Sequence, residues 1–339
     1  MENKKEVLLD LKNVKTYFPV KKGIMKKTVG HVKAVDDISI EIYKGETLGL
    51  VGESGCGKTT LGKSILQLIP ATGGEMNYNF DGNYKNLRTL PKKEMDLARK
   101  RMQIVFQDPH SSLNPSFTIF QSLSDPLKKF GVEKKEDRRK IIGDLLESVN
   151  MRAEYMDRYP HEFSGGQRQR IGIARALSVN PEIIVCDEAV SALDVSIQAQ
   201  VLNLLKKLKE ERDLTYIFIT HDLSVVEYIS DRIAVMYLGR IVELADADEL
   251  YKNKLHPYTK ALLSAIFVAE PDRKTKRIIL EGDVPSPMNP PSGCSFHPRC
   301  QYCMEVCKKE RPELKKYVIE GSDHYVACHL VEQEMKKDA

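Results

Sequence analysis

Residues 52–59 read GESGCGKT, a glycine-rich stretch that ends in Lys58 and Thr59. The stretch matches the pattern G-x-x-x-x-G-K-[ST], and it stands between a strand-like run and an apolar-periodic run that is typical of a helix. Backbone N–H groups of such a loop can surround phosphate oxygens, and the following helix adds partial positive charge at its N-terminus. We therefore expect nucleotide phosphates to be bound by a set of loop residues: Gly52, Ser54, Gly55, Cys56, Gly57, Lys58, Thr59 and Thr60.

A second motif supplies acidic side chains. Residues 183–188, IIVCDE, form a very apolar run that ends in Asp187 and Glu188. Carboxylates at the tip of a buried strand suit two tasks in phosphoryl transfer, since one can help Thr59 to hold Mg²⁺ and the other can orient the attacking water. We expect Asp187 to perform the first task and Glu188 the second, so the two motifs together predict a P-loop nucleoside triphosphatase.

The composition limits the remaining function classes. Of the 339 residues, 42% are hydrophobic and 29% are charged, which allows a large core and a well-solvated surface. The net charge of +4, from 52 basic and 48 acidic residues, is too even to indicate a nucleic-acid partner. No run approaches the roughly 20 apolar residues of a membrane-spanning helix, and the first residues do not resemble a signal peptide. We expect a protein that is cytosolic, or one that is attached to a membrane through partners.

Strand-like and helix-like runs alternate along the chain. Strands are expected within residues 8–18, 37–52, 103–106, 182–186 and 215–220. Helices are expected over residues 59–69, within 116–158, from 166 to about 178, and over 195–211. We expect a basic connection at residues 20–31 and a turn-rich stretch at 71–100. This order predicts an α/β fold with a mainly parallel sheet covered on both faces.

The composition changes after residue 270. Five prolines fall among several cysteines: Pro285, Pro287, Pro290, Pro291 and Pro298. We expect a small, loop-rich C-terminal module at about 284–332 that lies outside the chemistry of the phosphate loop. Five of the seven cysteines lie there, and zinc, an iron–sulfur cluster and thiols without metal are all open readings of their spacing. Disulfides are disfavoured because they need an oxidising compartment.

The residues 163–170, FSGGQRQR, resemble the signature motif of ABC ATPases, with Phe163 where that family usually has leucine. The rest of the family's motifs are present in order. Gln107 resembles the Q-loop residue, SALD at 191–194 resembles the D-loop with Asp194, and His221 resembles the switch histidine. Tyr17 or Phe18 stands where the family places an aromatic ring against adenine. The resemblance implies ATP and Mg²⁺ as ligands, with Gln107, Glu188 and His221 as catalytic residues and Gln107 also at the metal.

The resemblance becomes narrower in FQDPHSSLNPSF (106–117) and HPYTKALLSAI (256–266), which look like ATP-binding subunits of the oligopeptide/dipeptide permease family, where nickel importers also belong. It implies an ATPase domain over 1–255 with a RecA-like core, an antiparallel β subdomain and a helical subdomain at about 108–165, followed by an extension over 256–339. Some members hold a [4Fe–4S] cluster in that extension. The matching ligands here would be Cys294, Cys300, Cys307 and Cys328, with Cys303 as an alternative ligand and Zn²⁺ as the alternative metal.

The implied function is ATP hydrolysis that energises import of di- and oligopeptides at the cytoplasmic face of the inner membrane. Implied partners are a second ATPase subunit, identical or similar, two transmembrane permease subunits and an extracytoplasmic substrate-binding protein. The ATPases would pair head to tail, so the signature residues Ser164, Gly165, Gly166 and Gln167 would contact ATP held by the partner. Import of nickel or another small solute is the alternative. A soluble ABC ATPase acting on nucleic acid or ribosomes is disfavoured by the single phosphate loop.

Overall fold

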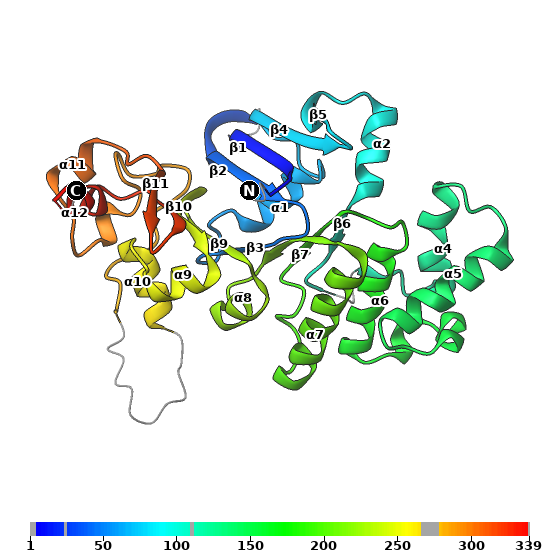
Figure 1. Ribbon diagram of the computed structural model, residues 1–339. Coiled ribbons are helices and arrows are strands. Elements are labelled where there is room, and N and C mark those ends of the chain that lie inside the picture. Colours follow the sequence, from blue (N-terminus) through cyan, green and yellow to red (C-terminus); the bar gives the residue numbers. More distant parts are fainter. Residues whose placement is uncertain (1–4, 24–25, 109–111, 266–277, 338–339) are drawn as a thin grey trace. The chain divides into compact units, whose positions relative to one another are not determined.

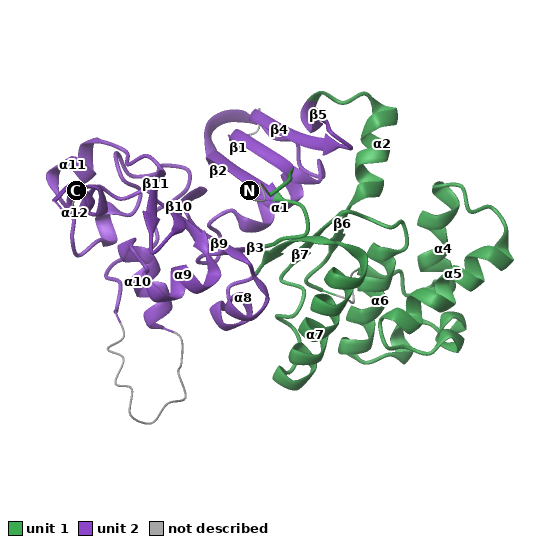
Figure 2. Ribbon diagram, in the orientation of Figure 1, with its two compact units in different colours: residues 1–7, 43–47, 89–219 green, residues 8–42, 48–88, 220–339 purple. Residues whose placement is uncertain are grey.

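The computed structural model describes residues 5–23, 26–108, 112–265 and 278–337. These residues gather into two compact units, coloured green and purple in Figure 2. Unit 1 comprises residues 1–7, 43–47 and 89–219, and unit 2 comprises residues 8–42, 48–88 and 220–339. Neither unit is one continuous stretch, because the chain passes from one to the other several times.

Unit 1 contains three parallel strands in the order β8-β7-β6. They are β6 (Met102–Val105), β7 (Ile183–Asp187) and β8 (Thr215–Ile219). Every residue of β7 and β8 is buried, as expected for parallel strands covered on both faces. The helices of this unit, cyan to green in Figure 1, are α2 (Lys92–Arg101), α4 (Ile119–Lys129), α5 (Lys135–Ser148), α6 (Gly165–Leu177) and α7 (Val195–Arg212), with 3₁₀ turns at Ala153–Asp157 and Pro160–Glu162.

One sheet of unit 2 is antiparallel, with the strand order β2-β1-β4-β5. Its strands are β1 (Val7–Lys22), β2 (Lys27–Tyr43), β4 (Gly73–Phe80) and β5 (Asn83–Asn86). The expected connection at residues 20–31 is wrong, since β1 and β2 extend into it, and the expected turn-rich stretch at 71–100 contains β4, β5 and most of α2. The strand ends at 20–31 are mostly polar and exposed, so backbone pairing forms them without the apolar pattern that would reveal them.

The second sheet of unit 2 carries the phosphate loop. Strand β3 (Thr47–Val51) lies parallel to β9 (Arg232–Tyr237), and antiparallel neighbours follow in the order β10 (Arg240–Asp246), β12 (Ser322–Val326) and β11 (Lys315–Ile319). Loop 52–57 leads from β3 into α1 (Lys58–Ile65). The other helices are α8 (Leu223–Ile229), α9 (Ala247–Lys252), α10 (Pro257–Ser264), α11 (Glu305–Lys309) and α12 (His329–Lys337), with 3₁₀ turns at Leu87–Thr89 and His297–Arg299.

The C-terminal residues are part of unit 2, so the expected separate module is not supported. The hairpin β11–β12 extends the sheet that carries the phosphate loop, because β12 pairs with β10 (Figure 1). Phe296 is buried in one hydrophobic cluster with Tyr237 and Tyr258, and its ring centroid lies 5.3 and 5.4 Å from theirs. The segment has few apolar residues, but it inserts them into a core made by distant parts of the chain. Composition does not reveal such a contact.

A buried histidine joins the C-terminal hairpin to β10. His324 and Glu243 have no exposed side-chain surface, and Nε2 of His324 lies 2.8 Å from Oε1 of Glu243. The same carboxylate accepts the backbone N–H groups of Leu255 at 2.7 Å and His256 at 3.1 Å. One buried carboxylate thus connects β10, the hairpin and the start of α10.

No helix within the four described ranges is long and apolar enough to cross a membrane.

We expect His324→Ala to lower the free energy of unfolding by about 2–4 kcal/mol, because it leaves the Glu243 carboxylate buried without its side-chain partner and opens a cavity. Urea unfolding measures this change, and limited proteolysis should show earlier cleavage near the hairpin.

Lys316→Ala is the matched control for that experiment. Lys316 lies on the same hairpin, in an exposed pair with Asp323 at 2.6 Å, so its loss should change stability by less than about 1 kcal/mol. Equal losses in the two variants would show that His324 does not hold the hairpin in place.

Candidate functional site

The phosphate loop packs directly against the backbone of two strands, one from each sheet of unit 2. Gly57 has a φ of 107°, and a Cβ atom on it would lie 1.9 Å from the carbonyl oxygen of Ala34 in β2. Gly52 has a φ of 151°, and its Cβ would lie 2.2 Å from the carbonyl oxygen of Met236 in β9. Only glycine fits at either position, for reasons of space as well as conformation.

Lys58 is buried although it carries a charge. Its Nζ donates to the carbonyl oxygens of Gly52 at 2.7 Å and Glu53 at 3.1 Å. Helix α1 begins at Lys58, with Gly57 as an N-cap that makes no side-chain hydrogen bond. The first N–H groups of any helix have no acceptor within that helix, so an ammonium and a helix N-terminus converge on one loop, an arrangement that binds anions. Burial raises the pKa of the Cys56 thiol in the same loop, which keeps it protonated.

Glu53, the second residue of the loop, is held by residues from the C-terminal part of unit 2. Two guanidinium nitrogens of Arg299 donate to its two carboxylate oxygens, at 2.8 and 3.1 Å. The backbone N–H of Glu53 donates to the hydroxyl oxygen of Tyr258 at 2.9 Å. The hydrogen bonds to Glu53 raise the pKa of Arg299, and burial raises the pKa of Tyr258, so the first stays charged and the second stays protonated.

The sequence did not predict a role for Glu53, Tyr258 or Arg299. Glu53 was passed over as a variable position of the loop motif, and the other two lie about 200 residues or more further along the chain. Tyr258 and Arg299 fall inside HPYTKALLSAI and CSFHPRC, which served only to identify a family. A charged residue inside an anion-binding loop needs a partner, and that was the available signal.

The two aromatic residues expected near adenine lie in different surroundings. The hydroxyl of Tyr17 donates to Asp36, which also accepts two hydrogen bonds from Arg240, at 3.0 and 2.6 Å. Burial raises the pKa of Tyr17 to about 12. Phe18 is 38% exposed. The Tyr17 ring is therefore fixed in direction, whereas Phe18 faces outward, and which of them contacts adenine stays a prediction.

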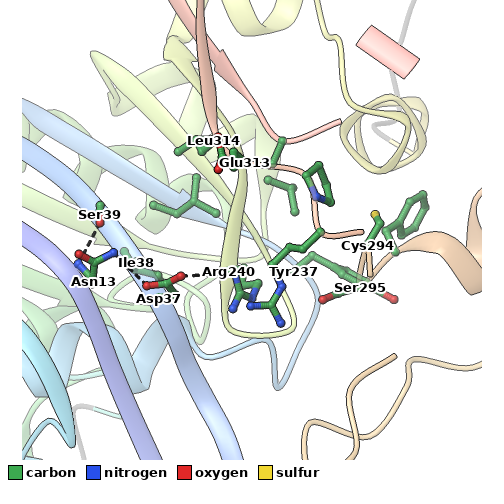
Figure 3. A pocket seen from close by; sticks show the side chains of 16 residues that line it. Asn13, Asp37, Ile38, Ser39, Tyr237, Arg240, Cys294, Ser295, Glu313 and Leu314 are labelled. Atoms are coloured by element: carbon green, nitrogen blue, oxygen red, sulfur yellow. Dashed lines mark hydrogen bonds and ion pairs between the residues drawn. The ribbon is translucent and has the colours of Figure 1, made fainter. Parts of the chain in front are cut away.

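Unit 2 also contains a cavity of about 530 Å³. Figure 3 shows Asn13, Ile38 and Ser39 on one side of it, and Cys294 and Ser295 on another. None of the residues that the sequence analysis assigned to nucleotide binding lines this cavity. We therefore do not interpret it as the nucleotide site.

In unit 1 the structure brings two predicted catalytic residues together. Nε2 of Gln107 donates to Oε2 of Glu188 at 2.8 Å. Glu188 follows the buried Asp187 at the end of β7 and has a φ of 50°, which is unusual for a residue with a side chain. Its N–H donates to the carbonyl oxygen of Ile219 at 2.9 Å, and Ser191 donates to its carbonyl oxygen from N at 3.1 Å and from Oγ at 3.0 Å. Glu188 thus has a fixed backbone and a fixed side-chain direction.

The signature residues start helix α6. Oγ of Ser164 accepts the N–H of Gln167 at 3.4 Å, and Oε1 of Gln167 accepts the N–H of Ser164 at 3.0 Å, which is a capping box. A Cβ atom on Gly166 would lie 2.5 Å from Cγ2 of Ile197 in α7, whereas Gly165 has more space. The capping box and the absence of a side chain at Gly166 therefore both serve the fold of unit 1. That these signature residues contact a partner's ATP stays a prediction.

The remaining predicted residues lie at the starts of other helices. Thr59 and Thr60 are half-buried in the first turn of α1, and Asp194 is the exposed N-cap of α7. His221 is exposed and directly precedes Asp222, the N-cap of α8. Residues 109–111 and 266, which formed part of the family resemblance, lie outside the described residues.

The expected [4Fe–4S] cluster and its zinc alternative are not supported. Within the part of the chain that the structure describes, no three Cys, His, Asp or Glu side chains are placed to hold one metal ion. The N–H of Cys294 does donate to the carbonyl oxygen of Cys307 at 2.8 Å. Burial raises the pKa of Cys294 to about 12, that of Cys300 to about 11 and that of Cys328, and the charge of other cysteines adds to each rise. Without metal these three thiols are therefore protonated, and metal binding would have to displace their protons.

The sequence matches two known families. The ABC transporter family matches residues 35–191, and the oligopeptide/dipeptide transporter C-terminal region matches residues 242–307. The chain is 50% identical over 328 residues to the oligopeptide transport ATP-binding protein AppF of Bacillus subtilis, which covers 96% of this chain and 98% of AppF. It is 52% identical over 297 residues to a putative peptide import ATP-binding protein of Brucella ovis, with 88% and 92% covered.

Solved structures of similar fold agree with the P-loop prediction. The ATP-binding cassette MJ0796, solved as a dimer in a post-hydrolysis state bound to ADP and Pi, matches with a TM-score of 0.60 and 30% identity, over 71% of this chain and 99% of that one. The protein cbiO1 of Clostridium perfringens matches with a TM-score of 0.61 at 24% identity, over 74% and 92%, and supports the fold alone.

We expect Gly57→Ala to destabilise the chain by at least about 2 kcal/mol, because the new methyl group collides with the Ala34 carbonyl and the backbone conformation becomes strained. Gly55→Ala is the matched control, since Gly55 also has a positive φ of 79° but has nothing within 4 Å of its Cβ position. Thermal unfolding without added nucleotide compares the two variants. Equal midpoints would show that the backbone contact at Gly57 does not constrain the loop.

Proposed function

Because the chain belongs to the ABC transporter family, among its oligopeptide transport ATP-binding proteins, we propose that it hydrolyses ATP to energise the import of di- and oligopeptides. The observation that carries the residue-level proposal is the contact between Gln107 and Glu188 at the tip of β7, in a chain that also has a fully formed phosphate loop. The first feature suits hydrolysis and the second suits phosphate binding.

Phosphate binding would use the loop and Lys58. ATP oxygens would take the place of the Gly52 and Glu53 carbonyls as partners of the Lys58 ammonium, since phosphate is a charged acceptor and a carbonyl is not. The backbone N–H groups of loop 52–57 and the start of α1 would supply the other donors. Tyr17 supports adenine better than Phe18, because its ring is already fixed through Asp36.

Hydrolysis would use Glu188 as the residue that orients the attacking water. The hydrogen bond that Gln107 donates holds the carboxylate in one direction, which is what a water-positioning residue requires. Thr59, Asp187 and Gln107 offer a hydroxyl, a carboxylate and an amide oxygen, which are hard oxygen ligands of the kind that Mg²⁺ prefers. When bound, Mg²⁺ would neutralise phosphate charge as it develops. His221 and Asp194 would contribute to the same reaction, as the family resemblance implies.

A second ATPase subunit would complete each site. We propose that Ser164, Gly165, Gly166 and Gln167 contact ATP held by this partner, at the N-terminus of the 13-residue helix α6. The likeness to a cassette solved as a dimer with ADP and Pi supports pairing. Either an identical or a similar subunit could fill this place.

The importer needs subunits that cross the membrane, since no described helix of this chain can do so. We propose two permease subunits and an extracytoplasmic binding protein as partners, with this chain peripheral at the cytoplasmic face of the inner membrane. Relatives are named for oligopeptide or peptide transport, which favours peptides over nickel as the cargo.

A [4Fe–4S] cluster held by Cys294, Cys300, Cys307 and Cys328 is a further proposal, and it rests on the family resemblance alone. A shared cluster would need these side chains to reorient as their thiols lose protons. Cys303, which affects Cys300 but directs its thiol toward the carbonyl of Met304, would be the alternative ligand.

We expect Glu188→Gln to leave ATP affinity within about twofold and to reduce the turnover of the assembled importer by at least about 100-fold, because the amide keeps the shape but loses the charge. ATP binding, steady-state hydrolysis and ATP-driven uptake of a labelled peptide into vesicles are the measurements. Glu210→Gln, on α7, is the control and should hydrolyse ATP normally. Normal turnover by Glu188→Gln would remove Glu188 from the mechanism. Uptake of nickel but not peptide by the wild-type importer would show that the cargo is nickel and not peptide.

Metal analysis tests the cysteine proposal. Anaerobic purification followed by iron, sulfide and zinc assays should give about four irons per chain if the cluster forms. Cys307→Ser should abolish it and Cys303→Ser should not. Stoichiometric zinc would replace the cluster by a zinc site, and absence of both metals would leave the cysteines as thiols.

A further inference from the structure

We propose that Arg299 is a positioning residue for the phosphate loop, and that through it the cysteine-containing segment 294–307 controls how well this chain binds ATP. The inference deepens the proposed function and rests on the assignment of loop 52–59 to ATP. It reverses the expectation that the C-terminal residues lie outside the chemistry of that loop.

The contact between Arg299 and Glu53 has the geometry of a strong ion pair. Two nitrogens of the guanidinium donate to two carboxylate oxygens, at 2.8 and 3.1 Å. The Arg299 side chain is 8% exposed and the Glu53 side chain 26% exposed, so water competes little for either partner. A forked guanidinium on a carboxylate fixes direction as well as distance, which a lysine would not do.

A second contact holds the backbone of the same residue. The hydroxyl of Tyr258 accepts the N–H of Glu53 at 2.9 Å. The Tyr258 ring packs against Tyr237 and Phe296, with centroids 4.7 and 5.4 Å away, and Phe296 lies three residues before Arg299. The side chain and the backbone of Glu53 are therefore held by one continuous packed region of unit 2.

The loop needs this contact for an electrostatic reason. Glu53 places a negative charge inside a loop that would bind phosphate, and its carbonyl oxygen is already a partner of the Lys58 ammonium. If the carboxylate turned toward Lys58, it would compete with phosphate for that ammonium. Arg299 occupies both carboxylate oxygens, so it neutralises the charge and keeps it directed away from the site.

Segment 294–300 connects this contact to the cysteines. Arg299 directly precedes Cys300, and Cys294 is tied to Cys307 by a backbone hydrogen bond of 2.8 Å. Any change that moves this segment, such as oxidation of its thiols or metal binding, would shift Arg299 relative to Glu53. The fraction of chains with a correctly formed loop would then fall, and the apparent dissociation constant for ATP would rise in inverse proportion.

The test uses the full chain in its assembled complex. We expect Arg299→Ala to raise the KM for ATP by roughly tenfold, the effect of losing one charge-assisted contact, with kcat at saturating ATP within about twofold of wild type. Hydrogen exchange without nucleotide should show faster exchange of the amides of residues 53–57. Lys308→Ala, which removes an exposed pair with Glu305 at the end of this segment, should change none of these values.

A double-substitution cycle separates positioning from a general loss of structure. Glu53→Ala breaks the same pair from the partly exposed side, but it also removes the charge that would compete with phosphate, so it should raise KM less than Arg299→Ala does. It serves as the second variant if Arg299→Ala folds poorly. Because the two residues act as one unit, the double variant should be no worse than the worse single variant. The inference would be overturned if the KM increases of the two single variants multiplied in the double variant. It would also be overturned if Arg299→Ala left both KM and the amide exchange of residues 53–57 unchanged. A wild-type chain that fails to bind ATP through Lys58 would instead overturn the proposed function.

Discussion

The close approach of loop 52–57 to two backbone carbonyls is the constraint on which the rest of unit 2 depends. Gly57 packs against the carbonyl of Ala34 in the antiparallel sheet. Gly52 packs against the carbonyl of Met236 in the second sheet of unit 2, which is mixed because β3 and β9 are parallel and β10 is antiparallel to β9. The loop therefore takes its shape only when both sheets are in place. Carbonyl oxygens of the loop in turn accept hydrogen bonds from the buried ammonium of Lys58, so the backbone of the loop orients this side chain. This explains why an eight-residue stretch can indicate a fold of several sheets.

The mixed sheet extends the same dependence to the C-terminal residues. Glu243 of β10 is buried and binds His324 of β12 as well as the N–H groups at the start of α10. Burial lowers the pKa of His256 to about 4, and its neutral ring accepts the N–H of Tyr258 at 3.0 Å, so α10 begins in a defined direction. That direction places the Tyr258 hydroxyl at Glu53. These contacts form a connected series of buried polar groups that have hydrogen-bond partners. Removing one group would leave its partner buried and unsatisfied, so the groups stabilise unit 2 as a set.

The sequence predicted the elements that have a strong local signal. The buried strands β7 and β8, helix α7 and the start of α6 all agree with apolar runs or capping residues, and the P-loop fold is confirmed by solved relatives. The long strands β1 and β2 were underestimated because their ends are polar and are formed by pairing alone. The hairpin at Lys315–Val326 was also missed, although its strands contain β-branched and aromatic residues. Contacts such as that between Glu53 and Arg299 join residues 246 positions apart, and neither periodicity nor spacing carries information about them. Proline and cysteine content wrongly suggested a separate module, since composition does not tell which core a few aromatic residues enter.

Several residues of unit 1 have a structural task in addition to the one expected from their motif, and this changes how their substitutions should be interpreted. Ser164 caps α6, so replacing it removes about 1 kcal/mol of helix stability whether or not a partner's ATP is present. Gly166 must stay small because Ile197 lies over it. Glu188 is held in a left-handed conformation by Ile219 and Ser191, at a cost of about 1 kcal/mol or more that its neighbours must offset. Strain of this kind persists where a side chain has to point in one direction. The hydrogen bond from Gln107 fixes the direction of the Glu188 carboxylate itself. A substitution that keeps the shape of the side chain, as glutamine does for glutamate, is therefore informative about chemistry, whereas a truncation would also release the backbone.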